Sequence, residues 1–330
     1  MKTIFFDRYG SPDVLQLREV DKPEPRGGEM LVRMHAASVN PADSYMMRGR
    51  PYPARSKTGW ARPKANGLGL DYAGVVEAVG EDVADFRPGD EVFGEVPDAL
   101  DSAGRSFAEY LCVAASSAVH KPSSVSFAEA AAVPLAGCTA LSALRDCAQV
   151  LPGEHVLVNG AGGGVGTHAV QLAKQFGATV TAVCSEGKRR QMMAIGADRV
   201  IDYQRCDFTS ERISYDVIID LVSSQSVRRC RRVLAPEGRF VWIGAPDTNG
   251  LFGPLVPAAK VLMMSVASRR RKWLCQSKPS TTTGLAQLAQ SLADGTLRPV
   301  IDRRYPLERV ACAIRHVEQG HACGKVVIEF

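Results

Sequence analysis

The sequence has few of the features that mark an exported, membrane-spanning or polyanion-binding protein. No apolar stretch reaches the ~18 residues of a membrane-spanning helix, because Gly, Pro or charged residues interrupt every candidate. The start, MKTIFFDRYG, becomes charged before the hydrophobic core of a secretory segment could form. The 40 basic and 35 acidic residues nearly balance, at a formal charge of +5. We therefore expect a cytoplasmic protein that binds neither a membrane nor a nucleic acid.

The nine cysteines include no Cys-x-x-Cys pair, so we interpret them as reduced thiols of a cytosolic protein. The basic run at 269–272 is interpreted as a solvated face rather than a nucleic-acid contact. A composition with 45% hydrophobic and 23% charged residues is typical of a globular protein. A length of 330 residues predicts about two domains.

The two parts of the chain differ in their patterns. The first hundred residues are rich in Gly and Pro, with short β-branched runs such as 29–33 and 75–79, which predicts a β-rich domain. A helix is expected over 126–144, with Ser126 as its N-cap and Glu129 as the capping-box partner. Strands at 155–159, 180–183, 199–202, 217–221 and 239–243 then alternate with helices at 165–176, 188–195 and 226–234. This alternation predicts a parallel, helix-covered sheet.

A glycine-rich turn joins the predicted strand 155–159 to the predicted helix 165–176. It reads Ala161-Gly162-Gly163-Gly164-Val165-Gly166. The order strand, turn, helix exposes backbone N–H groups and the positive end of the helix dipole, which together suit a pyrophosphate. Ala161 stands where the usual pattern has its first Gly, a change that still permits the tight turn. A turn without a ligand is the alternative, but its context favours a dinucleotide site.

The end of the next strand indicates which dinucleotide binds. NAD-specific sites usually carry Asp or Glu there, whereas this chain has Cys184-Ser185. Lys188, Arg189 and Arg190 follow, and these cations can neutralise a 2′-phosphate that an acid would repel. An ordinary solvated helix start, with Glu186 in it, is the alternative. The sequence favours NADPH over NADH.

Several motifs in one order resemble the medium-chain dehydrogenase/reductase superfamily. They are NPAD at 40–43, GLDYAGVV at 69–76, FRPGDEVFG at 86–94, SFAEY at 106–110, PLAGCTA at 134–140, the glycine turn, GAD at 196–198, YDV at 215–217 and GKVV at 324–327. Within it the chain is similar to the zinc-free quinone oxidoreductase, or zeta-crystallin-like, branch. Zinc-dependent relatives place a Cys where Asn40 stands and a His-Glu pair at Leu70-Asp71, and the stretch between Gly94 and Gly104 lacks the cysteines of a structural zinc lobe. No metal is expected.

The resemblance implies an α/β fold with a GroES-like β-rich domain, 1–120 and 266–330, and a Rossmann doubly wound parallel-sheet domain, 121–265. Lys188 matches the branch's 2′-phosphate lysine, Tyr203 the tyrosine beside the adenosine phosphate, and Lys325 a cofactor-contacting lysine. The full set of implied cofactor-binding residues is Thr139, Ala161, Gly163, Gly164, Val165, Ser185, Lys188, Tyr203, Ile243 and Lys325. Dimers are common in the family, so a homodimer is expected.

Members of this branch reduce quinones or activated carbon–carbon double bonds, so negative charge develops on a carbonyl oxygen. Preorganised donors lower that barrier, and Asn40 and Tyr45 are the candidates. Tyr45, with an unperturbed pKa of about 10, could donate a proton, or it could pack in a wall while solvent donates. Asp43 completes the catalytic candidates, either reacting or holding the loop.

The expected function is an NADPH-dependent reductase that transfers hydride to a quinone or an enone or enoyl substrate without a metal. A zinc-type alcohol dehydrogenase and a non-catalytic NADPH-binding protein are the alternatives.

Overall fold

The computed structural model describes residues 1–96, 105–244, 272–275 and 282–330. The chain divides into unit 1, Met1–Leu135 with Ser280–Phe330, and unit 2, Ala136–Pro279. Residues 121–135 were predicted to open the second domain but belong to unit 1, because α3 (Phe127–Ala131) packs on strands β3, β4, β5 and β15 of that unit. The second predicted boundary, 265/266, and residues 269–271 of the basic run lie outside the described residues.

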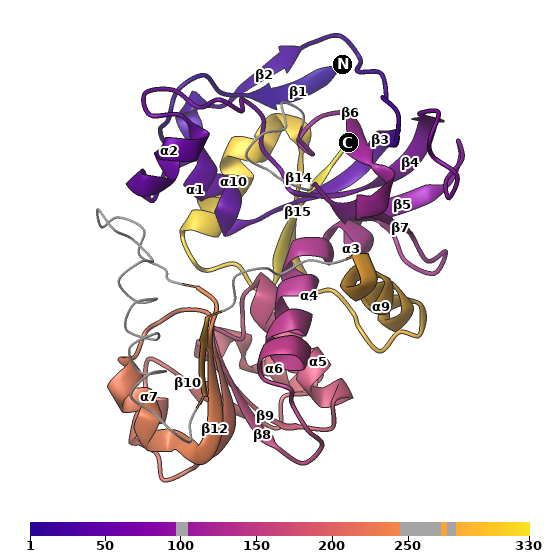
Figure 1. Cartoon of the computed structure of the whole chain (residues 1–330). Helices are drawn as coiled ribbons and strands as arrows, with labels where there is room; N and C mark the ends of the chain where they lie inside the picture. The colour runs from indigo at the N-terminus through magenta and orange to yellow at the C-terminus, as the bar shows by residue number, and fades with distance from the viewer. Residues whose placement is uncertain (97–104, 245–271, 276–281) are drawn as a thin grey trace. The chain divides into compact units, whose positions relative to one another are not determined.

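Unit 1 contains a seven-stranded sheet in the order β14-β15-β3-β4-β5-β7, with β6 paired to β3. Its strands are β3 (Glu29–Val39), β4 (Asp71–Val79), β5 (Glu91–Glu95), β6 (Tyr110–Ala114), β7 (Ala118–His120), β14 (Ile301–Pro306) and β15 (Lys325–Glu329), and β1 (Lys2–Phe5) pairs separately with β2 (Gln16–Glu19). The long strand β3 pairs with β4, β6 and β15. The last strand of the chain therefore joins the β-rich unit, as predicted (Figure 1).

The helices of unit 1 are α1 (Pro41–Arg48), α2 (Arg55–Thr58), α3, α9 (Thr282–Ala293) and α10 (Val310–Glu318). Helix α1 begins with Pro41 directly after its N-cap, Asn40, where a missing N–H costs nothing. It ends at Gly49, whose left-handed φ of 61° lets the chain turn away. A core of Met, Val, Ile and aromatic side chains fills the unit and includes Met47 of this helix. Strand β3 thus leads directly into α1 at one end of the sheet.

The predicted helix 126–144 is interrupted. Its start is confirmed, since the Ser126 side chain accepts from Glu129 N and the Glu129 carboxylate accepts from Ser126 N at 2.9 Å. Helix α3 stops at Ala131, however, and α4 (Pro134–Leu141) begins afresh. Pro134 offers no N–H and its ring disfavours helical backbone at the preceding residue, so one continuous helix cannot form.

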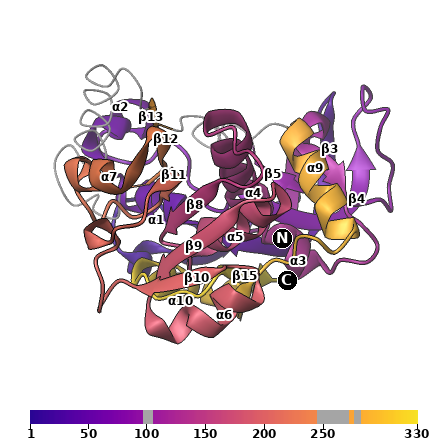
Figure 2. The ribbon, with the colours of Figure 1, turned by 90° about the horizontal axis from the view of Figure 1, so that it is seen from below.

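Unit 2 contains a six-stranded parallel sheet in the order β10-β9-β8-β11-β12-β13, the Rossmann order 3-2-1-4-5-6 (Figure 2). Its elements are β8 (His155–Asn159), α5 (Gly164–Gln175), β9 (Thr179–Cys184), α6 (Arg189–Ala194), β10 (Arg199–Asp202), β11 (Tyr215–Asp220), α7 (Val227–Val233), β12 (Leu234–Trp242) and β13 (Lys272–Cys275). The predicted alternation is confirmed. Strand β12 begins earlier than predicted, and β13 was placed in the other domain.

In the described part of the chain, no helix combines the length and apolarity needed to cross a membrane.

Candidate active site

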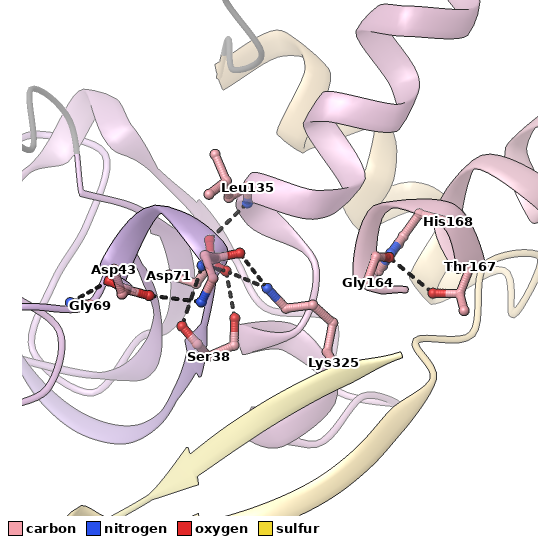
Figure 3. A network of polar contacts seen from close by, with 10 residues as sticks. Ser38, Asp43, Gly69, Asp71, Leu135, Gly164, Thr167, His168 and Lys325 are labelled. Carbon is pink, nitrogen blue, oxygen red and sulfur yellow. Dashed lines mark hydrogen bonds and ion pairs between the residues drawn. The ribbon is translucent and has the colours of Figure 1, made fainter. Parts of the chain in front are cut away.

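A buried polar network lies in unit 1 where three strands meet (Figure 3). The register pairs Ser38 at the end of β3 with Asp71 at the start of β4. It also pairs Val39 with Val326, so Lys325 at the start of β15 reaches the same end of the sheet. Strand pairing therefore brings together side chains that are far apart in the sequence.

Asp71 is the centre of this network and has no exposed surface. Its Oδ2 atom lies 3.1 Å from Lys325 Nζ and accepts from Ser38 Oγ at 2.5 Å and from Asn40 Nδ2 at 2.9 Å. Its Oδ1 accepts from the backbone N–H of Leu135 at 2.8 Å. A buried charge is costly unless it is paired and hydrogen-bonded, and here both conditions hold.

Lys325 and Asn40 complete the network. Lys325, only 3% exposed, donates from Nζ to Asn40 Oδ1 at 2.7 Å. The Asn40 amide in turn donates to Asp71 and to the carbonyl of Ser38, the latter at 3.4 Å. Both predicted residues are therefore brought together, but the Asn40 amide has its oxygen and both protons engaged inside the protein.

Asp43 serves as a buried cap for helix α1. One carboxylate oxygen accepts from the backbone N–H of Asn40 at 2.7 Å and the other from that of Gly69 at 2.9 Å. Burial raises the pKa of Asp43 to about 6, although the two N–H donors oppose this shift. These contacts hold the start of α1 and the segment before β4, the structural role that the sequence left open for Asp43.

Tyr45 lies two residues further along α1 and is partly buried. Burial raises the pKa of its phenol. A raised pKa keeps the hydroxyl protonated through neutral pH, so this side chain can serve as a hydrogen-bond or proton donor.

In unit 2 the glycine turn has the geometry of a phosphate cradle. Gly160 has a positive φ of 90°, and α5 begins at Gly164 after its N-cap, Gly163. A Cβ on Gly166 would lie 2.4 Å from the Gly160 carbonyl oxygen, so only glycine allows this close helix–strand packing. A Cβ on Gly163 would meet nothing nearer than 3.7 Å, which leaves that backbone open to approach. Ala161 is fully buried at the base of the turn.

The residues predicted to hold the adenosine phosphate lie at the carboxyl ends of neighbouring strands. Cys184 of β9 pairs with Asp202 of β10, so Ser185 and Tyr203 follow two adjacent strand ends. Lys188 folds back over the turn, with Nζ 3.4 Å from the Gly162 carbonyl oxygen. Ligands of this fold bind outside the carboxyl ends of the strands, so these residues share the expected position.

A second polar cluster lies between β8 and β11, where the strand order reverses. Asn159 donates from Nδ2 to Asp220 Oδ1 at 2.8 Å, and Asp220 also accepts from Ser223 N at 2.9 Å. Burial raises the pKa of Asp220. Ile243 follows β12 and donates its N–H to Asp220 O, while Thr139 is a buried residue of α4. Such a switch point is where dinucleotides lie in doubly wound sheets.

Three candidate functional residues of unit 1 were not predicted from the sequence, namely Ser38, Asp71 and Arg105. Asp71 was considered only as part of the absent zinc pair. The sequence does show a charged residue at the start of two strands, Asp71 in β4 and Lys325 in β15. That these two residues meet depends on the pairing of both strands with β3. Arg105 stands directly before the SFAEY motif and is 2% exposed, a burial that the sequence does not reveal.

The residues at the zinc position do not suit that ion. Zinc needs thiolate, imidazole or free carboxylate ligands, whereas this position offers an amide at Asn40, an apolar side chain at Leu70 and a carboxylate already paired with Lys325. Across the residues that the structure describes, no three His, Cys, Asp or Glu side chains are grouped as metal ligands.

Comparisons with known proteins agree with this geometry. Residues 26–123 match a family model described as the alcohol dehydrogenase GroES-like domain, and residues 195–328 match one described as zinc-binding dehydrogenase. The chain is 32% identical to the human mitochondrial NAD(P)H oxidoreductase RTN4IP1, over 98% of this chain and 87% of that protein. It is 35% identical to the tomato (Solanum lycopersicum) 2-methylene-furan-3-one reductase, over 99% and 79%. The quinone oxidoreductase from Coxiella burnetii superimposes with a TM-score of 0.87 at 32% identity, covering 100% and 99% of the two chains.

The chain belongs to the medium-chain dehydrogenase/reductase superfamily, in its quinone oxidoreductase branch. It combines a GroES-like domain with a Rossmann-type domain and is an oxidoreductase that uses a nicotinamide cofactor.

Proposed function

We propose that the chain is an NADPH-dependent reductase that transfers hydride, without a metal ion, to a quinone or to a carbon–carbon double bond conjugated with a carbonyl. The cofactor part of this proposal depends on Lys188, which lies over the glycine turn, and on Ser185 and Tyr203, which follow two adjacent strand ends. The names of two relatives support the substrate class, since one is a quinone oxidoreductase and the other a methylene-furanone reductase.

The charges in the segment that follows β9 favour a 2′-phosphate. Glu186 would repel that phosphate, but Arg189 holds both of its oxygens, with Nε at 2.7 Å and Nη2 at 2.9 Å. With Glu186 neutralised by Arg189, the net positive charge of this segment comes from Lys188 and the exposed Arg190. Cationic groups at this position recognise the 2′-phosphate, whereas NAD-specific sites carry an acid.

The bound nicotinamide supplies the hydride, and negative charge then develops on the substrate's carbonyl oxygen. The Asn40 amide is engaged by Asp71, Ser38 and Lys325, so we assign donation to that oxygen to Tyr45. Asp43 and Asn40 support this role, because they fix the start of the helix that carries Tyr45.

The first test measures NADPH and NADH oxidation with quinones, enones, enoyl thioesters and aldehydes, alongside metal analysis of the purified protein. We expect turnover of quinones or enones by a protein that contains no stoichiometric zinc. Zinc at one equivalent would contradict the metal-free proposal. Cofactor binding without turnover of any compound would favour the non-catalytic alternative.

The second test is Lys188→Ala, with Arg212→Ala as a control that removes one exposed cation from the same unit. Charge-assisted contacts contribute about 1.5–3 kcal/mol, so the Kd for NADPH should rise roughly 10- to 100-fold. The Kd for NADH should change less than about threefold in either variant. Equal losses for both cofactors would refute the assignment of Lys188.

We also propose that the protein is a cytoplasmic homodimer. Because one relative is mitochondrial, the location should be tested by fluorescence imaging of the tagged chain in its own cells. Signal confined to an organelle would contradict a cytoplasmic location. Light scattering would give the oligomeric state, and a monomeric mass at micromolar concentration would contradict a dimer.

A further inference from the structure

Arg105 in unit 1 is a buried arginine, and one side of its guanidinium, formed by Nε and Nη2, lacks an acceptor among the described residues. It is 2% exposed, and its Nε and Nη2 atoms have no hydrogen-bond partner in the described part of the chain. Its Nη1 atom has only a 3.8 Å contact with the Met46 sulfur. Buried polar groups are normally hydrogen-bonded, and an unpaired buried charge costs several kcal/mol. A position that retains such a group needs an explanation.

Other arginines of this chain use the same two atoms, Nε and Nη2, to bind carboxylates. Arg48 donates from Nε and Nη2 to the two oxygens of Glu318 at 2.6 and 2.8 Å. Arg189 holds Glu186, and Arg145 holds Asp146, through the same two atoms. This planar fork matches a carboxylate in both spacing and charge. In Arg105 this fork is buried and has no acceptor among the residues that the structure describes.

The described neighbours of Arg105 include a second donor, and none of them is an acceptor for its Nε or Nη2 atom. Asp43 lies close enough for its charge to oppose the lowering of the Arg105 pKa to about 10 by burial. Both Asp43 oxygens, however, already accept from the backbone N–H groups of Asn40 and Gly69. The adjacent Ser106 hydroxyl is also buried without a partner and packs against Gly69. Three unfilled donors, Nε, Nη2 and the hydroxyl, therefore occur on consecutive residues.

We propose that Arg105, assisted by Ser106, is an anion-binding site that takes a carboxylate of the substrate, so that the preferred substrates are enones or quinones that carry a carboxylate. This deepens, and for its catalytic part rests on, the reductase function proposed above. Met46, which Arg105 contacts, directly follows Tyr45 on α1, so Arg105 packs on the same helix turn that carries the proposed donor. A carboxylate there would fix the substrate through a bidentate, desolvated ion pair.

Binding is tested without turnover, by titrating the protein calorimetrically with 4-oxopentanoate and with its methyl ester. The wild type should bind the acid more tightly than the ester. Arg105→Met should weaken binding of the acid by at least tenfold and leave the ester unchanged. Arg105→Lys, which keeps the charge but not the fork, should fail to restore binding, and Ser106→Ala should lose less than Arg105→Met. Unchanged affinity for the acid in Arg105→Met would overturn the proposal.

Stability separates this proposal from a structural role for Arg105. Arg48→Met removes a filled fork and should lower the Tm. Arg105→Met removes an unpaired buried charge, so its Tm should equal or exceed that of the wild type. A fall in Tm as large as that of Arg48→Met would show that the chain itself fills the fork and would overturn the proposal.

Turnover distinguishes failure of this inference from failure of the proposed function. The matched substrates are 4-oxopent-2-enoate and its methyl ester, both enones. We expect a kcat/KM ratio of acid to ester that falls at least tenfold in Arg105→Met. Reduction of both compounds with an unaltered ratio would leave the reductase function intact and overturn the carboxylate site. Binding of 4-oxopentanoate that depends on Arg105, without reduction of either enone, would support the carboxylate site and overturn the enone part of the proposed function.

Discussion

The buried pair between Lys325 and Asp71 makes a quantitative prediction about stability. Lys325→Met keeps most of the aliphatic stem but leaves the Asp71 carboxylate, which has no exposed surface, without its counter-charge. Breaking a buried pair in this way costs about 3–5 kcal/mol. For a unit of this size, that corresponds to a fall in Tm of roughly 6–20 °C.

A matched control and a double variant make the prediction specific. Lys2 and Glu308 form a pair in the same unit at a similar distance, 3.3 Å, but both side chains are about half exposed. Lys2→Met should therefore cost less than about 1 kcal/mol. In Lys325→Met/Asp71→Asn the charge is gone while the amide oxygen still accepts from Leu135 N, so about 2–3 kcal/mol of the loss should return.

The assay is urea unfolding followed by circular dichroism, with thermal unfolding as a second measure. The reasoning is refuted if Lys325→Met costs less than about 1 kcal/mol, or if the double variant is no more stable than Lys325→Met. Either result would mean that the Asp71 carboxylate does not depend on Lys325 for its stabilisation.

Three further predictions concern single residues. Asp43 has a pKa of about 6 against 3.8 in its ordinary state, so the folded state binds its proton more tightly than the unfolded state. The stability of unit 1 should consequently fall by up to about 3 kcal/mol as pH rises from about 4 to 6, and Asp43→Asn should remove that slope in unfolding measurements. Gly166→Ala should lower stability by more than about 2 kcal/mol because of the 2.4 Å clash, whereas Gly163→Ala should keep the Tm and weaken only cofactor binding in titrations. Ser126→Ala should cost about 1 kcal/mol by removing the cap of α3, and a change below about 0.3 kcal/mol would contradict the capping assignment.

The Rossmann-type half was predictable because its signals are local. A buried parallel strand is a continuous apolar run, and the runs at 155–159, 180–183 and 217–221 are each followed by a helical pattern within a few residues. The break at Pro134 was also readable in principle, since proline disfavours helix at the preceding residue, but the Ala-rich pattern around it concealed the interruption. Strand β13 follows residues 245–271 and is only four residues long, so no alternation indicated that it pairs with β12.

The candidate site was predictable only in part. The glycine turn, Ser185 and Lys188 lie within 30 residues of one another and carry a known spacing. Lys325 and Asp71 are 254 residues apart, and their contact depends on the register of β15 and β4 against β3. The family resemblance predicted Lys325 as a residue that contacts the cofactor. In the structure its side chain contacts Asp71 and Asn40.

The same network supports the proposed metal-free reaction, although one matching family model is described as zinc-binding. A divalent ion at this position would need Asp71 as a ligand, but that carboxylate accepts from Lys325, Ser38, Asn40 and Leu135 N. The ion would also lie beside the Lys325 ammonium, and two cations a few ångströms apart in a buried site repel strongly. Replacing Lys325 alone would not create a zinc site, because Asn40 and Leu70 still offer neither a thiolate nor an imidazole. The positive charge of Lys325 balances the negative charge of Asp71, so the proposed reaction needs a donor outside this pair to polarise the substrate. In the proposed reaction Tyr45 is that donor, while Arg105 is assigned to a carboxylate of the substrate.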